Sequence, residues 1–437
     1  MVANQDKKTV TARGMEPGRG QKPPTCLDKA RRTADWICHN QYVSHPDWMA
    51  ESREGFDMNE DMNFGRFTRN YSLSKRKIVH LSSNWISGMT IYGLTLLNDF
   101  FNEKRYLQAA VKGSWYLRCL QNTMESVPER QGAINERIPS NRWCAARDAL
   151  SGAWGLLRLH RATGEQEFLR RAELFAAWHS SQAMRRGFPL GYYFFDEERE
   201  GHNYFAGCQG GGALFYCDLY RVTGKREYLN TAGKLADYYR SHFFSADGAL
   251  NVICNPVTGH KGDRESTPAW SDMHKYNDDF GMLALLAVHE LTGRGEHLDT
   301  AIKYMRWVVS EQHPDGGFGK FKLSISSCVA ALNLLNMHLI TGAAEFKNAA
   351  YKALRHLEES VVEAPGDPAI HGGILGMDVA RLAKNNDMLC LRVSMYAMYT
   401  FLLFGIFEEL IERGGKDKIT PAVAKNPMFP GLRLSSR

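Results

Sequence analysis

The stretch TGEQEFL at residues 163–169 has close copies elsewhere in the chain: TGKREYL at 223–229, TGRGEHL at 292–298 and TGAAEFK at 341–347. A fifth, divergent copy reads FNEKRYL at 101–107. In every copy an alanine stands eight residues after the Gly or Asn, at Ala110, Ala172, Ala232, Ala301 and Ala350. Recurrence in one fixed register indicates a repeated structural unit.

Each copy of this stretch separates two helical patterns. Gly and Asn tolerate the left-handed backbone conformation that ends a helix, so each copy ends one helix and begins its antiparallel partner. The recurrent alanine allows the two helices to approach closely. The copies therefore predict αα-hairpins at residues 85–121, 146–182, 209–243, 278–312 and 326–361.

Two helical patterns have no partner of their own. Residues 26–42 resemble the second helix of a hairpin, and residues 388–412 resemble a first helix. Pairing them gives a sixth hairpin and closes a ring. First helices such as GMLALLAVHEL at 281–291 are apolar nearly all round, as expected for an inner ring covered by an outer one. We therefore predict an all-α fold, an (α/α)6 toroid of six helical hairpins, with an open solenoid as the alternative.

Composition and charge narrow the expected class of protein. The 437 residues are 44% hydrophobic and 23% charged, which suits a globular protein. We expect the toroid domain over residues 26–413, between a disordered tail at 1–25 and a loose tail at 414–437. The net charge is +6, but the basic residues are dispersed, so nucleic acid is not an expected partner. With no long apolar run and no secretory signal pattern, we expect no membrane partner.

Nine cysteines are scattered without a CxxC spacing. This pattern favours free thiols in a cytoplasmic protein and suggests no metal or other cofactor. The chain also lacks the Walker A, HExxH and GxSxG motifs. GCQGGG at 207–212 is interpreted as the tight start of an inner helix.

The long connections, which run from each outer helix to the next inner helix, should all emerge at one end of the ring. We expect the functional site at this end, called here the mouth. Small β-ribbons are predicted there in GFPLGYYFF (187–195), DGALNVIC (247–254) and DGGFGKF (315–321). Counting back about fifteen residues from each linker gives polar positions where the inner helices begin, at Ser87, Asp148, Gln209, Asp278 and Ser327.

Three carboxylates at the mouth are candidates for catalysis. Asp278 could cap a helix, but an adjacent Asp279 adds a like charge that a purely structural role does not explain. Paired carboxylates suit glycosidic bond cleavage, where one acts as an acid and the other as a base or nucleophile. Asp148 offers a third carboxylate at the equivalent position of another hairpin. We expect Asp279 or Asp148 as the general acid and Asp278 as the second carboxylate.

Aromatic, basic and amide side chains near these carboxylates are candidates for substrate binding. Trp143 and Tyr276 would stack on sugar rings, and Arg142 or Arg147 would bind an anionic group. The full candidate set is Trp85, Arg142, Trp143, Arg147, His202, Tyr204, Gln209, His274, Tyr276 and Asn277.

The linker pattern TG-xxx-[YF]L-xxA resembles that of the six-hairpin glycosidase superfamily, and this resemblance covers most of residues 26–413. The segment YNDDFGMLAL at 276–285 resembles the Asp-Asp segment of α-1,6-mannanases, which implies Asp278 and Asp279 as the catalytic carboxylates. The similarity to unsaturated glucuronyl hydrolases instead implies Asp148 together with one of that pair. Sugar 2-epimerases and several lyases carry the same linker.

The leading hypothesis is a glycoside hydrolase acting on an oligosaccharide, with a uronic acid as one option for its sugar. A polysaccharide lyase is the first alternative, with His202, Tyr204 and His274 moving the proton. A sugar epimerase using His80, His202 and His274 is the second. A toroid that binds sugar without catalysis is the third.

Overall fold

The computed structural model describes residues 24–42, 63–136, 143–185, 187–189, 191–194, 204–255, 258–278, 280–376, 387–414 and 419–434, without the side chains of Trp143, Arg185, Tyr192 and Phe194.

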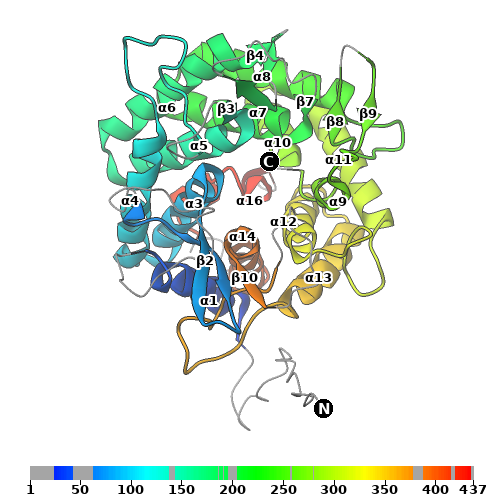
Figure 1. The fold of residues 1–437 in the computed structure, drawn as a ribbon. Coiled ribbons are helices and arrows are strands. Elements are labelled where there is room, and N and C mark those ends of the chain that lie inside the picture. The colour runs from blue at the N-terminus through cyan, green and yellow to red at the C-terminus, as the bar shows by residue number, and fades with distance from the viewer. Residues whose placement is uncertain are drawn as a thin grey trace, which may run out of the picture.

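Two concentric rings of helices form the molecule (Figure 1). The inner ring consists of α3 (Asn84–Phe101), α5 (Ala146–Thr163), α7 (Ala206–Thr223), α10 (Gly281–Thr292), α12 (Ser324–Thr341) and α14 (Leu391–Ile406). The outer ring consists of α4 (Lys104–Leu120), α6 (Gln166–Trp178), α8 (Arg226–His242), α11 (Gly295–Ser310), α13 (Ala344–Glu358) and α1 (Cys26–His39). The predicted (α/α)6 toroid is confirmed.

The ring closes where the two orphan helices meet. Helix α1 packs against α14, and α14 packs against α3, so the first and last parts of the toroid share one hairpin. A three-stranded sheet reinforces this junction because β1 (Thr68–Ser72) pairs with β2 (Lys77–Leu81) on one side and with β10 (Met388–Cys390) on the other. The pairing of 26–42 with 388–412 predicted from sequence therefore holds.

The linkers adopt the conformation that the repeat predicts. Gly164, Gly224, Gly293 and Gly342 end inner helices with φ between 71° and 77°, and Asn102 does so with φ of 56°. All are left-handed, a region that costs Gly little and Asn less than most residues. The five recurrent alanines are fully buried between the paired helices.

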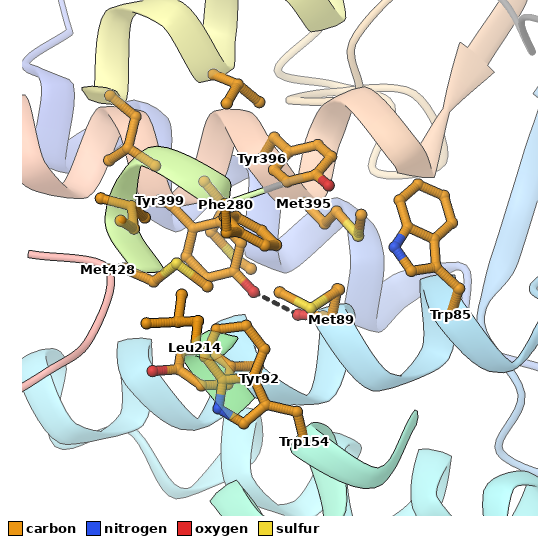
Figure 2. Packing of buried hydrophobic residues seen from close by; sticks show 14 of the residues in the cluster. Trp85, Met89, Tyr92, Trp154, Leu214, Phe280, Met395, Tyr396, Tyr399 and Met428 are labelled. Carbon is orange, nitrogen blue, oxygen red and sulfur yellow. Dashed lines mark hydrogen bonds between the residues drawn. The ribbon is translucent and has the colours of Figure 1, made fainter. Parts of the chain in front are cut away.

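The inner helices pack closely because glycines face each other at their crossings. A Cβ atom on Gly210 of α7 would lie 2.4 Å from the Cα atom of Gly281 in α10. A Cβ atom on Gly155 of α5 would lie 2.5 Å from the carbonyl oxygen of Gly88 in α3. The predicted tight start of the helix in GCQGGG is confirmed. Large side chains fill the centre, including Tyr92 and Tyr399 (Figure 2).

The strands lie in the long connections, and two of the three predicted β-ribbons are present. Residues 187–195 contain β5 (Phe188–Pro189) and β6 (Tyr192–Phe194), which pair with β4 (Met184–Arg185) and β3 (Trp143–Ala145). β8 (Ile253–Cys254) pairs with β7 (Tyr204–Phe205) and β9 (Lys261–Gly262). The prediction for 315–321 is wrong, because Gly316 and Gly319 take positive φ values of 90° and 71° and make turns there.

The far end of the ring is covered by the C-terminal segment, residues 419–434. Its helices α15 (Pro421–Ala424) and α16 (Pro430–Leu434) pack against α3, α10 and α12, and Figure 1 shows α16 near the ring centre. Met428 and Phe429 are fully buried there. This packing differs from the loose tail expected at 414–437, because the apolar residues of NPMFPGL find a surface between inner helices.

Two of the described helical stretches, Ser324–Thr341 and Leu391–Ile411, are long and apolar enough to cross a membrane by length and composition alone. Both belong to the inner ring or continue it, and 72% and 78% of these stretches is buried inside the protein. A helix that is apolar all round is also what the core of a double ring requires.

Candidate active site

Three residues at the second position of neighbouring inner helices meet at the mouth. They are Trp85 of α3, Arg147 of α5 and Arg392 of α14. The guanidinium carbons of Arg147 and Arg392 each lie 4.6 Å from the centre of the Trp85 ring. Helices α5 and α14 both contact α3 in the ring, so the toroid itself brings these side chains together. Trp85 and Arg147 are among the binding residues predicted from the sequence, and Arg392 is not.

A pair of carboxyl groups lies beside Arg147. Asp148, in the first turn of α5, accepts a hydrogen bond of 3.0 Å from Nη1 of Arg147. Glu136, from the connection before α5, is in hydrogen-bonding contact with Asp148, and its Oε2 atom is buried. Burial and then the charge of Asp148 raise the pKa of Glu136 well above its usual range, while Arg69 on β1 opposes this rise. Two carboxyl groups in such contact repel each other when both are ionised, so Glu136 and Asp148 share one proton.

His274, at the end of the short helix α9 (Pro268–His274), faces Arg392. Its Nδ1 lies 3.1 Å from the carbonyl oxygen of Asn277. A carbonyl only accepts hydrogen bonds, so Nδ1 donates, and in the neutral ring Nε2 keeps its lone pair. This Nε2 lies 3.5 Å from Nη2 of Arg392. The centre of the His274 ring lies 4.2 Å from the centre of the Trp270 ring. His274 thus presents an acceptor toward the arginine cluster.

A narrow cavity joins these groups to the interior of the ring. Its lining includes Trp85, Arg147, Trp154, Gly207 and Phe280, from the three inner helices α3, α5 and α7 and the residue that precedes α10. Phe280 has a left-handed φ of 71°, which is uncommon outside Gly. Its ring packs against Trp154 and Tyr396, as Figure 2 shows. A strained backbone residue held by its neighbours is a feature that functional sites often contain.

Asp278 is a buried helix cap. Its Oδ2 accepts a hydrogen bond of 2.6 Å from the backbone of Met282, and Nδ2 of Asn333 lies 3.4 Å from its Oδ1. We expected this residue within a helix from 278, but α10 begins at Gly281 because left-handed Phe280 cannot continue a right-handed helix. The capping interpretation therefore describes its contacts, and a catalytic role for Asp278 stays a prediction.

Four other candidate residues are among the described ones. Two of them pack away from the cluster around Trp85, and the other two have buried side chains. Tyr204 packs 6.1 Å from Tyr238 of outer helix α8. The ring of Tyr276 stacks at 5.6 Å on Trp307 of outer helix α11. Gln209 is fully buried and donates to the carbonyl of Pro189, and Asn277 is also fully buried. The structure thus brings together Trp85, Arg147, Asp148 and His274, while Tyr204 and Tyr276 belong to the aromatic packing of the outer wall.

Asp279, Arg142 and His202 lie outside the described residues, and so does the side chain of Trp143. Three residues that sequence reasoning missed complete the cluster: Arg69, Glu136 and Arg392. Arg392 could have been found, because it takes the same helix position as Arg147. Glu136 and Arg69 come from a connection and a strand, which the helical register does not reach.

One group of described residues has the side-chain types that bind metals. Ligand atoms of Asp237, Glu296 and His297 all lie within 4.8 Å of one another. Arg294 already supplies a cation there, with Nη2 2.6 Å from Asp237 and 2.8 Å from Glu296. The group belongs to outer helices α8 and α11, with Glu296 and His297 at the end of α11 remote from the mouth.

Comparison with known proteins rests on structure. No protein-family model matches the sequence, and no curated protein matches it. A glycoside hydrolase family 76 α-mannanase from Bacteroides thetaiotaomicron superposes with a TM-score of 0.63 at 14% identity, covering 89% of this chain and 98% of that one. Cellobiose 2-epimerase from Bacillus thermoamylovorans gives a TM-score of 0.62 at 12% identity, covering 86% and 98%. The chain has the six-hairpin glycosidase fold.

An unsaturated glucuronyl hydrolase specific for heparin has this six-hairpin fold as well, with a TM-score of 0.62 at 12% identity, covering 88% of this chain and 98% of that one. These three structures are named as a hydrolase of mannan, an epimerase and a hydrolase of unsaturated glucuronides. Identities this low establish a shared fold, and the six-hairpin fold hosts more than one reaction. The reaction has to be argued from the side chains at the mouth.

Proposed function

We propose that the protein is a glycoside hydrolase that acts on an oligosaccharide carrying a carboxylate. The observation that supports this most directly is the Glu136–Asp148 pair beside Arg147. A carboxyl group whose pKa is raised keeps its proton to higher pH and can give it to the oxygen of a leaving sugar, which is the task of a general acid. Asp148 is thus the predicted acid with Glu136 as its proton partner.

The two carboxyl groups act as one proton-donating unit. They are in hydrogen-bonding contact, whereas the acid and its counterpart in glycosidases stand roughly 5–9.5 Å apart. In the proposed reaction the unit gives its proton to the leaving oxygen as the glycosidic C–O bond breaks. Water forms the new C–O bond, and a proton from that water returns to a carboxylate. The sequence predicts Asp278 as the second carboxylate for this step; because Asp278 caps α10, we propose its neighbour Asp279 instead.

The charge of the cluster favours an anionic sugar. Arg69, Arg147 and Arg392 bring three positive charges, and of the Glu136–Asp148 pair only one carboxyl is ionised when Glu136 holds its proton. Guanidinium groups bind carboxylates through two parallel hydrogen bonds, so a uronate fits this surplus. Trp85 is buried against both guanidinium groups and holds them at the mouth.

Asp148→Asn tests the proposal, with turnover followed on uronate oligosaccharides, both saturated and unsaturated. Loss of the acid should lower kcat at least about a hundredfold with the melting temperature nearly unchanged. Glu227→Gln, a fully exposed carboxylate in the first turn of α8, is the matched control. Full activity of Asp148→Asn would overturn the role. A fall in ultraviolet absorbance identifies an unsaturated-uronate hydrolase, and a rise identifies a lyase.

A sugar epimerase is the second candidate because of His274. With Nδ1 donating to the carbonyl oxygen of Asn277, its Nε2 lies on the side of Arg392 as an acceptor, and it could take a proton from a sugar carbon. An epimerase leaves the mass of the sugar unchanged in ordinary water, but in heavy water the product carries deuterium at the reacting carbon. Deuterium uptake without cleavage, abolished in His274→Asn, would favour this candidate over the hydrolase. The lyase alternative has less support, since Tyr204 packs in the outer wall.

A further inference from the structure

A second hollow opens at the outer wall of the ring, beside the mouth. It lies between the β8–β9 ribbon, the residues that precede it, the turn after α9 and outer helix α11, which Figure 1 shows side by side. Its volume is about 370 Å³, within the range of small-molecule sites. None of the residues of the Trp85 cluster lines it. We call it the rim pocket.

The wall of the rim pocket contains an indole held in a fixed orientation. Trp307, on α11, is partly exposed and lines the pocket. Its ring is nearly parallel to that of Tyr276, at 5.6 Å and 7°, and to that of Tyr304, at 6.2 Å and 16°. Both tyrosines are buried, so they keep the indole in place before any ligand arrives. An ordered, partly exposed indole is a surface on which the C–H face of a sugar can pack.

The polar groups around this indole are balanced in charge. Lys261 and Lys275 face Asp263 and Glu265, and Nζ of Lys275 lies 2.7 Å from Asp263. An anion would favour a surplus of cations, as the Trp85 cluster has. Hydroxyl groups both donate and accept, so they match a mixture of ammonium and carboxylate groups. A tryptophan framed by mixed donors and acceptors therefore fits a neutral sugar ring.

The rim pocket is connected to the candidate active site through consecutive residues. His274 lies against Arg392 in the mouth cluster, and Lys275, the next residue, lines the rim pocket. We propose that the rim pocket is a distal subsite that binds a neutral sugar unit of an oligosaccharide whose reacting end lies at the mouth. The inference rests on the proposed function only for the class of ligand, an oligosaccharide.

The test compares binding of long and short neutral chains to the full-length protein by calorimetry, with mannohexaose and cellohexaose against the matching disaccharides. Trp307→Ala should weaken hexasaccharide binding about tenfold, the loss expected for one stacking contact. Lys275→Ala, which changes a partly exposed side chain, should also weaken hexasaccharide binding. It gives an independent result if Trp307→Ala folds poorly. Trp115→Ala removes a tryptophan that is 42% exposed on α4 and is the matched control.

The outcomes separate this inference from the proposed function. Trp307-dependent binding without cleavage of any glycan would leave the subsite in place and overturn the hydrolase. A second outcome is that uronate chains are cleaved but Trp307→Ala, Lys275→Ala and the parent bind the hexasaccharides equally well. This outcome would overturn the subsite and keep the hydrolase. Absence of binding by both hexasaccharides would overturn the subsite as well.

Discussion

The proton shared by Glu136 and Asp148 has consequences for stability that do not depend on the substrate. The pKa of Glu136 is raised in the folded protein, so the folded state keeps a proton that the unfolded chain releases near its ordinary value of about 4.3. In the window between the two values the folded state binds more protons, and stability falls as pH rises. Asp148, Arg69 and Arg147 are the charged groups that face Glu136.

Glu136→Gln should therefore gain stability over the parent as pH increases. The amide keeps the shape of the side chain and cannot ionise. The variant therefore does not lose the stability that the parent loses as pH rises above the pKa of Glu136 in the unfolded chain. Urea unfolding at pH 5 and pH 8 measures the difference between the two proteins. An equal difference at both values would contradict the raised pKa of Glu136.

The arginines around Trp85 yield a prediction about substrate charge. Arg147→Met and Arg392→Met should each raise KM for a carboxylate-bearing oligosaccharide about tenfold or more, since each removes a charged hydrogen-bond donor. The same chain with its carboxylate reduced to an alcohol should be affected much less. Arg118→Met removes a guanidinium 5.1 Å from the outer-ring Trp115 and serves as control. Equal losses on both substrates would indicate a structural role.

At the residue scale, the sequence predicted the members of the site that the helical register governs. Counting from a linker reaches Asp148 in the first turn of α5, and Arg147 and Trp85 were found as basic and aromatic residues beside the positions so reached. Glu136 was out of reach because its position follows from the path of an irregular connection. Asp278 shows the opposite difficulty, since capping and catalysis both favour an aspartate at the start of a helix.

The crossing of α7 and α10 leaves no room for an added methyl group. Gly210→Ala should destabilise the protein by about 1–3 kcal/mol, because the new methyl group would overlap Gly281. Gly233→Ala, in the interior of α8 with no atom within 4 Å of the added Cβ, should instead stabilise by up to about 1 kcal/mol. Urea unfolding measures both. Equal stability of the two variants would contradict the close approach.

Element types were predictable where several local signals agree. Apolar periodicity, a left-handed linker and a buried alanine all indicate hairpins, and the helices form as expected. Residues 315–321 failed because their glycines allow positive φ, and the turns they make exclude a strand. The late start of α10 could not be predicted either. Phe280 has no local preference for a left-handed φ, and it is the packing against Trp154 and Tyr396 that holds it there.

The covered far end of the ring bears on the stability of the whole molecule. Asn426 accepts a hydrogen bond of 2.9 Å from Tyr92, and Arg433 pairs at 2.8 Å with Glu290. Removal of residues 419–437 should lower the melting temperature and increase the binding of an apolar dye, since it uncovers inner-helix surface. Removal of 435–437 alone leaves the described contacts intact and is the control. Equal melting temperatures for both shortened chains would contradict this packing.

The closing hairpin also sets an order of events during biosynthesis. Of the ring helices, α1 leaves the ribosome before the others, but the helix that covers its apolar face, α14, follows about 350 residues later. At about 5–20 residues per second, α1 waits roughly 20–70 s for that partner. Nascent chains therefore carry an exposed stripe with Trp36 and Ile37 throughout their synthesis. Capture by chaperones should fall on this first helix, and it should end when α14 emerges.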